Sequence, residues 1–153
     1  MDREIYQELF TASKKNHMLS QVFTYITGIL VLITLYLYYN GIINKYENYF
    51  YYAYLAMALI SIILSFKFNK QLKNNNVVIT EILQKNKKNV FSFARNGISQ
   101  GCINAILIII LIGSFFVKGT QLDILNDLFF IIIIFSYWVS NRFYFNMLSK
   151  VEI

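Results

Sequence analysis

The chain has 153 residues, of which 57% are hydrophobic and only 14% are charged. This balance excludes an ordinary soluble domain, because too few polar side chains remain to cover the outside of a fold. The net charge of +6 does not indicate a nucleic-acid partner, since no basic residue is interleaved with a base-stacking or groove-reading pattern.

Long apolar segments predict four transmembrane helices in a single membrane domain. A helix needs about 20 residues to cross about 30 Å of hydrocarbon, and a charge at its centre costs roughly 2.5 to 3.5 kcal/mol. The expected fold is an all-α integral membrane protein, a four-transmembrane-helix bundle. In chain order we expect a cytoplasmic amphipathic N-terminus at 1–17, transmembrane helices at 18–40 and 48–66, a cytoplasmic loop or interfacial helix at 67–96, transmembrane helices at 97–117 and 123–141, and a cytoplasmic tail at 142–153.

Lysine and arginine residues predict the orientation of this bundle. Three precede the first predicted helix, seven lie between the second and the third, and two follow the fourth, whereas only Lys45 and Lys118 lie in the other two loops. By the positive-inside rule both termini and the middle loop are cytoplasmic. We expect the protein in the cytoplasmic membrane of a prokaryote.

The loop between the first two predicted helices is rich in tyrosine, with eight of the twelve tyrosines between 36 and 54. Tyrosine prefers the headgroup level of a bilayer, so an interfacial belt is expected. A ligand-binding tyrosine cluster is the alternative. The eight are Tyr36, Tyr38, Tyr39, Tyr46, Tyr49, Tyr51, Tyr52 and Tyr54.

The segment 67–96 contains a predicted basic amphipathic helix. Its apolar residues recur at helical spacing: Ile79, Ile82, Leu83, Val90 and Phe93. Such a stripe favours the surface of an anionic inner leaflet. We expect lipid headgroups to be contacted by Lys85, Lys87, Lys88 and Arg95.

Small residues recur every fourth position at the start of the third predicted helix, as Gly97, Gly101 and Ala105. Gln100 and Asn104 are expected beside them on the same side. Small residues let helices approach closely in lipid, and the two amides can hydrogen-bond across the contact. Packing within one subunit, a homo-oligomer interface and a polar pathway all remain open.

The fourth predicted helix reaches normal length only if it includes Asp127, about one turn inside the outer boundary. Asp127 with Asn104 is therefore a possible intramembrane polar site, because ionisable groups at membrane depth are often functional. The alternative is an interfacial acid paired with Lys118 or Lys45, and the shallow depth of Asp127 favours it.

The sequence contains none of the patterns that catalysis or metal binding requires. Cys102 is the single cysteine and His17 the single histidine, and there is no His-Glu-x-x-His, nucleophile motif or glycine-rich phosphate loop. We therefore expect no enzyme, cofactor or metal site.

The sequence favours a non-catalytic membrane protein that acts by protein–protein interaction, as an accessory subunit or an immunity or defence factor. Its expected partners are the lipid bilayer with its anionic headgroups and another membrane protein or a second copy of itself. The alternative is a small oligomeric channel, transporter or lipid-handling protein, with a polar path along the third helix.

Overall fold

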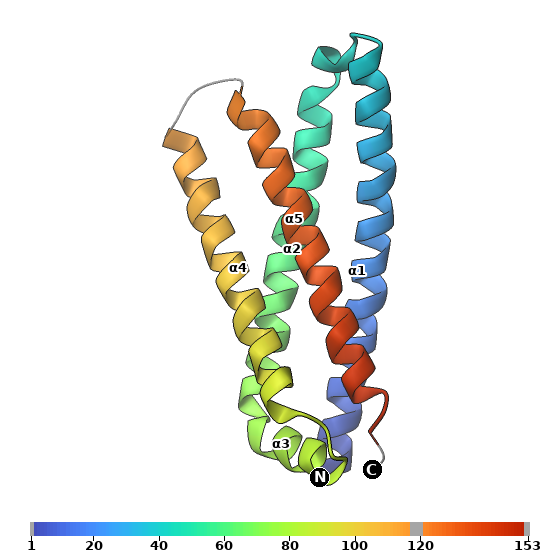
Figure 1. Ribbon diagram of the computed structural model, residues 1–153, viewed down its shortest axis with the longest axis vertical. Coiled ribbons are helices and arrows are strands. Elements are labelled where there is room, and N and C mark those ends of the chain that lie inside the picture. Colours follow the sequence, from blue (N-terminus) through green and yellow to red (C-terminus); the bar gives the residue numbers. More distant parts are fainter. Residues whose placement is uncertain (1, 117–120, 152–153) are drawn as a thin grey trace.

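The computed structural model describes residues 2–116 and 121–151, and this part of the chain is helical with no β-strand (Figure 1). A short 3₁₀ helix, η1, stands between the first two α-helices. The elements are α1 (Asp2–Tyr39), η1 (Ile43–Lys45), α2 (Glu47–Asn74), α3 (Asn76–Lys85), α4 (Val90–Phe116) and α5 (Gln121–Leu148).

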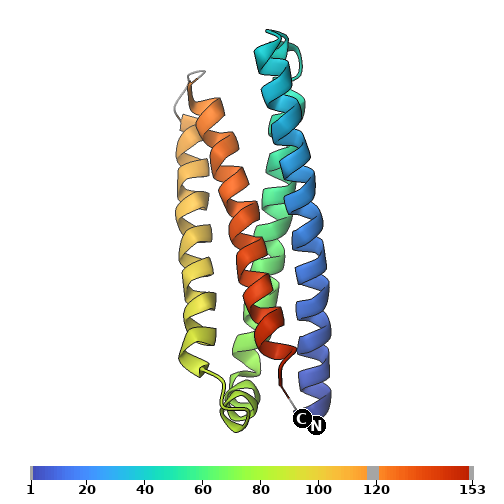
Figure 2. The same ribbon diagram turned by 45° about the vertical axis from the view of Figure 1, so that its right-hand side comes forward.

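Four of these helices are long and apolar enough to cross a membrane, as the sequence predicted. They run lengthwise beside one another, while the short helix α3 lies at the end of the bundle that also carries both chain termini (Figures 1 and 2). We call this the terminal end, and we call the opposite end, with η1, the loop end. The apolar spans are Arg3–Tyr39, Glu47–Asn74, Val90–Ile110 and Asn126–Leu148.

The four long helices extend beyond the transmembrane segments predicted from the sequence. Helix α1 is one continuous helix of 38 residues, so the predicted N-terminal segment 1–17 is its first part. At 1.5 Å per residue it is about 57 Å long, well beyond the hydrocarbon thickness. A charge-free window marks only the apolar part of a helix, whereas the backbone hydrogen bonds of α1 continue through its charged first part.

Helix α5 is the central helix of the bundle. It packs against α1, α2 and α4, whereas α1 and α4 make no close backbone approach within the described residues. The α1–α2 hairpin and the α4–α5 hairpin lie next to each other and separate toward the loop end (Figure 2). Helix α4 therefore has one side against its neighbours and the rest facing outward.

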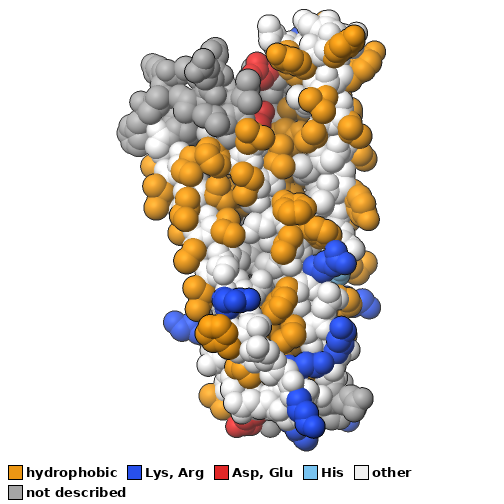
Figure 3. All heavy atoms as spheres, in the orientation of Figure 1, with side chains coloured by type: hydrophobic (Ala, Val, Ile, Leu, Met, Phe, Trp, Pro, Cys, Tyr) orange, Lys and Arg blue, Asp and Glu red, His pale blue; other side chains and the backbone are white. Residues whose placement is uncertain are grey.

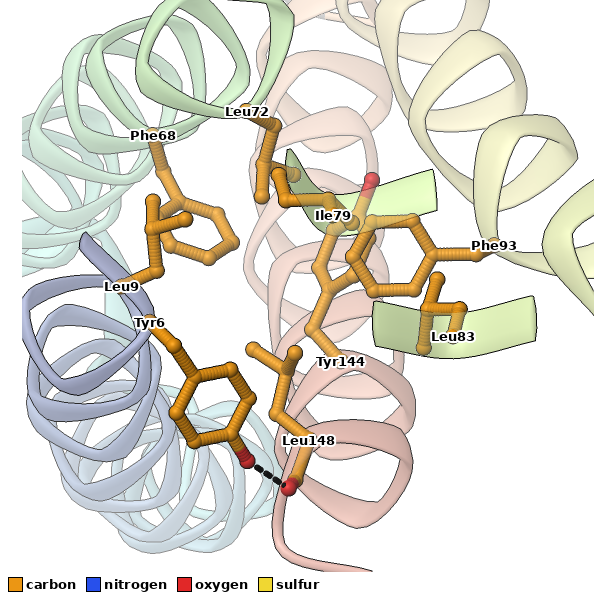
Figure 4. Packing of buried hydrophobic residues seen from close by; sticks show 9 residues of the cluster. All are labelled: Tyr6, Leu9, Phe68, Leu72, Ile79, Leu83, Phe93, Tyr144 and Leu148. Atoms are coloured by element: carbon orange, nitrogen blue, oxygen red, sulfur yellow. Dashed lines mark hydrogen bonds between the residues drawn. The ribbon is translucent and has the colours of Figure 1, made fainter. Parts of the chain in front are cut away.

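A hydrophobic cluster at the terminal end joins all five α-helices (Figure 4). The Tyr6 hydroxyl in this cluster donates a hydrogen bond to the Leu148 carbonyl and so ties the start of α1 to the end of α5. The members of this terminal-end cluster are Tyr6, Leu9, Phe68, Leu72, Ile79, Leu83, Phe93, Tyr144 and Leu148.

The segment between α2 and α4 differs from the single amphipathic stripe predicted by the sequence. Helix α3 ends at Lys85, and Lys87 has a left-handed backbone with a φ of 53°. The Ser92 amide then donates to the Asn89 side chain at 3.0 Å, which caps the start of α4. Val90 and Phe93 therefore belong to α4. The apolar face of α3 is buried in the terminal-end cluster and is not available to a membrane surface.

A second hydrophobic cluster fills the bundle toward the loop end. It joins α2, α4 and α5, with α1 side chains packed around it. Outside it, large apolar side chains cover the upper and middle part of the visible face, while Lys and Arg gather over its lower part (Figure 3). The buried members are Tyr54, Met57, Ala58, Ile62, Leu107, Phe130, Ile133 and Ile134.

Candidate functional site

The small residues Gly97, Gly101 and Ala105 do not form one straight contact face on α4. Each residue turns a helix by about 100°, so a step of four residues overshoots a full turn by about 40°. From Gly97 to Ala105 the stripe thus rotates by about 80°. Gly97 lies against α5, whereas Ala105 is exposed and Gly101 has no atom within 4 Å of the position that a Cβ would occupy.

Gly97 makes the close approach on this helix. A Cβ at Gly97 would lie 2.7 Å from the hydroxyl oxygen of Tyr144. Tyr144 is only 2% exposed, and its ring has edge-on contacts with Phe93 at 4.9 Å and Phe68 at 5.4 Å. The glycine leaves the space that the tyrosine hydroxyl occupies.

The two amide side chains of α4 face into the bundle. Gln100 is buried and its Nε2 donates to the Ser65 hydroxyl of α2 at 2.9 Å. Asn104 is also buried. One turn before Gln100, the Asn96 Nδ2 donates to the Ser140 hydroxyl of α5 at 2.9 Å. Polar contacts thus join α4 to two of its neighbours, α2 and α5.

These amides are part of a wider set of buried polar side chains. In lipid such groups hydrogen-bond to neighbouring helices or to their own backbone, as the Ser61 hydroxyl does to the Met57 carbonyl at 2.8 Å. The Ser13 and Thr27 hydroxyls differ, since they are buried without a hydrogen-bond partner among the described residues. The set comprises Ser13, Ser20, Thr27, Ser61, Ser65, Gln100, Asn104, Asn126, Ser140 and Asn141.

The outward side of α4 carries its own stripe of residues. Ile98, Ala105 and Ile109 are exposed along it, together with the single cysteine, Cys102, and Gly101 between them is half-buried. The backbone of α4 is therefore accessible at Gly101 between larger apolar side chains.

The predicted headgroup-binding residues surround the turn between α3 and α4. Lys85, Lys87 and Arg95 are exposed and Lys88 is half-buried. Phe91 lies among them and is also exposed. Their contact with lipid headgroups stays a prediction, and the sequence did not single out Phe91.

Asp127 lies on α5, six residues after Gln121, which is about 9 Å along the helix axis. It is half-buried and lines a cavity of about 470 Å³ between α1, α2 and α5 at the loop end. Asn104, its predicted companion, does not line this cavity. Glu47 and Tyr54 of α2 do, and the sequence reading gave neither of them a role beside Asp127.

The eight clustered tyrosines separate into inward and outward groups. Tyr38, Tyr39 and Tyr49 are exposed, as a belt requires, whereas Tyr54 is fully buried. Both Tyr38 and Tyr54 line the cavity. A side-chain hydrogen bond joins Tyr54 to Thr34 of α1. The tyrosines of this region therefore contribute both to the outer surface of the bundle and to the lining of the cavity.

Among the described residues, no three His, Cys, Asp or Glu side chains are grouped closely enough to hold a metal ion. His17 stacks on Phe145 with ring centroids 5.0 Å apart, a packing contact between α1 and α5. No protein-family model matches the chain, and no curated protein or solved structure shows significant similarity to it.

Proposed function

We propose that this chain is an integral protein of a prokaryotic cytoplasmic membrane, with four transmembrane helices and both termini in the cytoplasm. Supporting this orientation, α3 and both ends of the chain lie at one end of the bundle (Figures 1 and 2), and most Lys and Arg residues flank the helices there. The exposed apolar side chains along the helices are suited to contact with lipid.

Cysteine labelling tests this orientation. In a Cys102→Ser background, Lys45→Cys at the loop end is expected to react with a membrane-impermeant maleimide added to intact cells. Lys87→Cys at the terminal end is expected to react only after the cells are permeabilised. Both lysines are exposed, so access to the reagent decides the outcome. The reverse pattern would show the opposite orientation.

We further propose that the protein acts without catalysis, by association of α4 with a transmembrane helix of another membrane protein or of a second copy. The observation that carries this is the open backbone at Gly101, with exposed Ala105 one turn away. Small residues on an outward helix face permit close backbone contact, which is how helices associate in lipid. An accessory subunit or an immunity or defence factor would use such a face.

The polar residues of α4 do not support a path through a single chain. Gln100 and Asn104 are buried between helices, and Gln100 is hydrogen-bonded to Ser65. Neither amide lines the cavity beside Asp127. A second candidate function, the binding of a small molecule, is favoured by that cavity.

Photo-crosslinking tests the association of α4. A photoreactive residue at Ile109, on the outward stripe and 68% exposed, is expected to form an adduct with a second polypeptide in native membranes. The adduct mass distinguishes a second copy of this 18.0 kDa chain from another protein. Gly101→Leu is expected to reduce the adduct by at least about fivefold, because the new side chain holds the backbones apart.

A photoreactive residue at Ile63 of α2 is the matched control, since Ile63 is 64% exposed on an apolar helix without that small-residue stripe. It is expected to crosslink mainly to lipid. Equal adducts at both positions, or an adduct at Ile109 that Gly101→Leu leaves unchanged, would contradict a specific α4 contact.

A further inference from the structure

The cavity at the loop end has the size and lining of a binding site for a small molecule. Its volume of about 470 Å³ lies within the roughly 300 to 1,000 Å³ typical of ligand pockets. Three helices and the connection between α1 and α2 line it, and it is partly open to the outside, where Leu35, Tyr38 and Leu128 are exposed. The lining residues are Val31, Thr34, Leu35, Tyr38, Ile43, Asn44, Glu47, Phe50, Tyr54, Asp127, Leu128 and Ile131.

Most of this lining is apolar. Val31 and Leu35 come from α1, Phe50 from α2, and Leu128 and Ile131 from α5. Van der Waals contact with such walls stabilises an apolar ligand body and excludes a strongly hydrated inorganic ion as the natural occupant.

Glu47 and Asp127 are the only charged side chains among these lining residues, and both are acidic. Glu47 begins α2 and is half-buried, and Asp127 is half-buried on α5. Figure 3 shows acidic side chains near the top of the visible face, between hydrophobic ones. Lys45, two residues before Glu47, has its Nζ 5.8 Å from the centre of the Tyr46 ring and does not line the cavity. Lys118, the basic residue nearest to Asp127 along the chain, lies outside the described residues.

Neither water nor plain hydrocarbon suits this cavity. An acyl chain drawn into it would strip water from the two carboxylates, which is costly for an ionised group. Water alone would leave the apolar walls wet. A ligand with a cationic head and an apolar body satisfies both parts of the lining.

We propose that the cavity binds an organic ammonium ion carried on an apolar body. The head group lies beside Glu47 and Asp127, where charge-assisted hydrogen bonds form, and the body lies along Val31, Leu35 and Ile131. The aromatic rings of Tyr38, Phe50 and Tyr54 provide further attraction for a cation. This proposal goes beyond the association of α4 and does not depend on it.

Tyr54 and Thr34 give this site a fixed wall. Tyr54 is buried in the loop-end cluster, and its side-chain hydrogen bond to Thr34 joins α2 to α1. The Thr34 hydroxyl also donates to the Leu30 carbonyl at 2.8 Å. Hydrogen bonds within the protein therefore hold the wall between α1 and α2, which lowers the entropic cost of binding.

Equilibrium dialysis with two probes that differ mainly in charge tests the proposal. The purified full chain, in micelles of an uncharged maltoside detergent, is expected to bind radiolabelled n-octylammonium saturably. The double variant Glu47→Gln, Asp127→Asn is expected to bind it at least about tenfold more weakly, because each substitution keeps the shape and removes a charge. Binding of n-octanol is expected to be equal in both proteins.

Two further variants keep the test decisive. Glu8→Gln with Glu81→Gln removes the same net charge at the exposed terminal end and is expected to leave octylammonium binding unchanged. Ile131→Trp narrows the cavity without removing a carboxylate and is expected to weaken both probes. Non-saturable octylammonium binding, or equal loss in the two double variants, overturns the proposal.

Competition distinguishes the two natural sources of this chemistry. Phosphatidylethanolamine carries an ammonium group on a lipid, whereas phosphatidylglycerol does not. If added phosphatidylethanolamine displaces octylammonium and phosphatidylglycerol does not, the ligand is a lipid headgroup. If neither lipid displaces it, the ligand is a free amphiphilic amine.

Discussion

Leu83→Ala is expected to lower the free energy of unfolding by about 3 kcal/mol, within the roughly 2 to 5 kcal/mol observed for such core truncations. Leu83 is 0% exposed and belongs to the terminal-end cluster with Phe93 and Tyr144 (Figure 4). The loss of its side chain leaves a cavity where α3 packs against α1, α2 and α4. Thermal or denaturant unfolding of the purified protein in maltoside micelles, followed by helical circular dichroism, measures the change.

Val77→Ala on the same helix is the control for Leu83. Val77 is 71% exposed, so its truncation is expected to change the unfolding free energy by less than about 0.5 kcal/mol. Equal effects of the two substitutions would mean that α3 does not pack in the bundle. A free interfacial helix, as the sequence suggested for 67–96, would give that result.

Gly97→Ala is expected to lower the free energy of unfolding by about 1 to 3 kcal/mol, as overpacking of a core does. The added methyl would lie 2.7 Å from the Tyr144 hydroxyl oxygen. Tyr144 cannot move aside freely, because Phe68 and Phe93 hold its ring and its hydroxyl is hydrogen-bonded to the Asn96 side chain. The same unfolding measurement in detergent checks the result.

Gly101→Ala, one turn further along α4, is the matched control. No atom lies within 4 Å of its Cβ position, so alanine meets no obstacle there. Alanine is favoured over glycine in a helix by about 1 kcal/mol, and Gly101→Ala is therefore expected to be neutral or stabilising. If both glycine variants have the same effect, the close approach of Gly97 to Tyr144 is not rigid.

The small-residue stripe on α4 shows why part of the candidate site could be read from the sequence. The spacing of Gly97, Gly101 and Ala105 indicates that some face of this helix allows close approach, because backbone access depends on local residue size. It does not show which of these residues contacts which neighbour. The Tyr144 hydroxyl of α5 occupies the space beside Gly97, whereas no atom of the described residues occupies the space beside Gly101.

The lining of the loop-end cavity was harder to predict from the sequence than the small residues of α4. Asp127 could be found as an anomaly, since a carboxylate in an apolar segment is costly and therefore conspicuous. Glu47 could not be linked to it, because Glu47 sits at a helix start beside a predicted loop, where acids are common. Only the packing of α5 against the α1–α2 hairpin brings the two into one lining.

The four long apolar helices could be predicted from the amino-acid sequence, because the length and hydropathy of a segment are local properties and a helix satisfies its own backbone hydrogen bonds. The rotation of each helix about its axis could not be predicted in this way, because it depends on packing between helices that are distant in the sequence. Helices that are apolar all round have no amphipathic stripe to point inward, so the contacts of a few residues, such as Gly97 with Tyr144 and Gln100 with Ser65, select the buried faces. Those rotations also create the loop-end cavity and the open face of α4 on which both proposals rest.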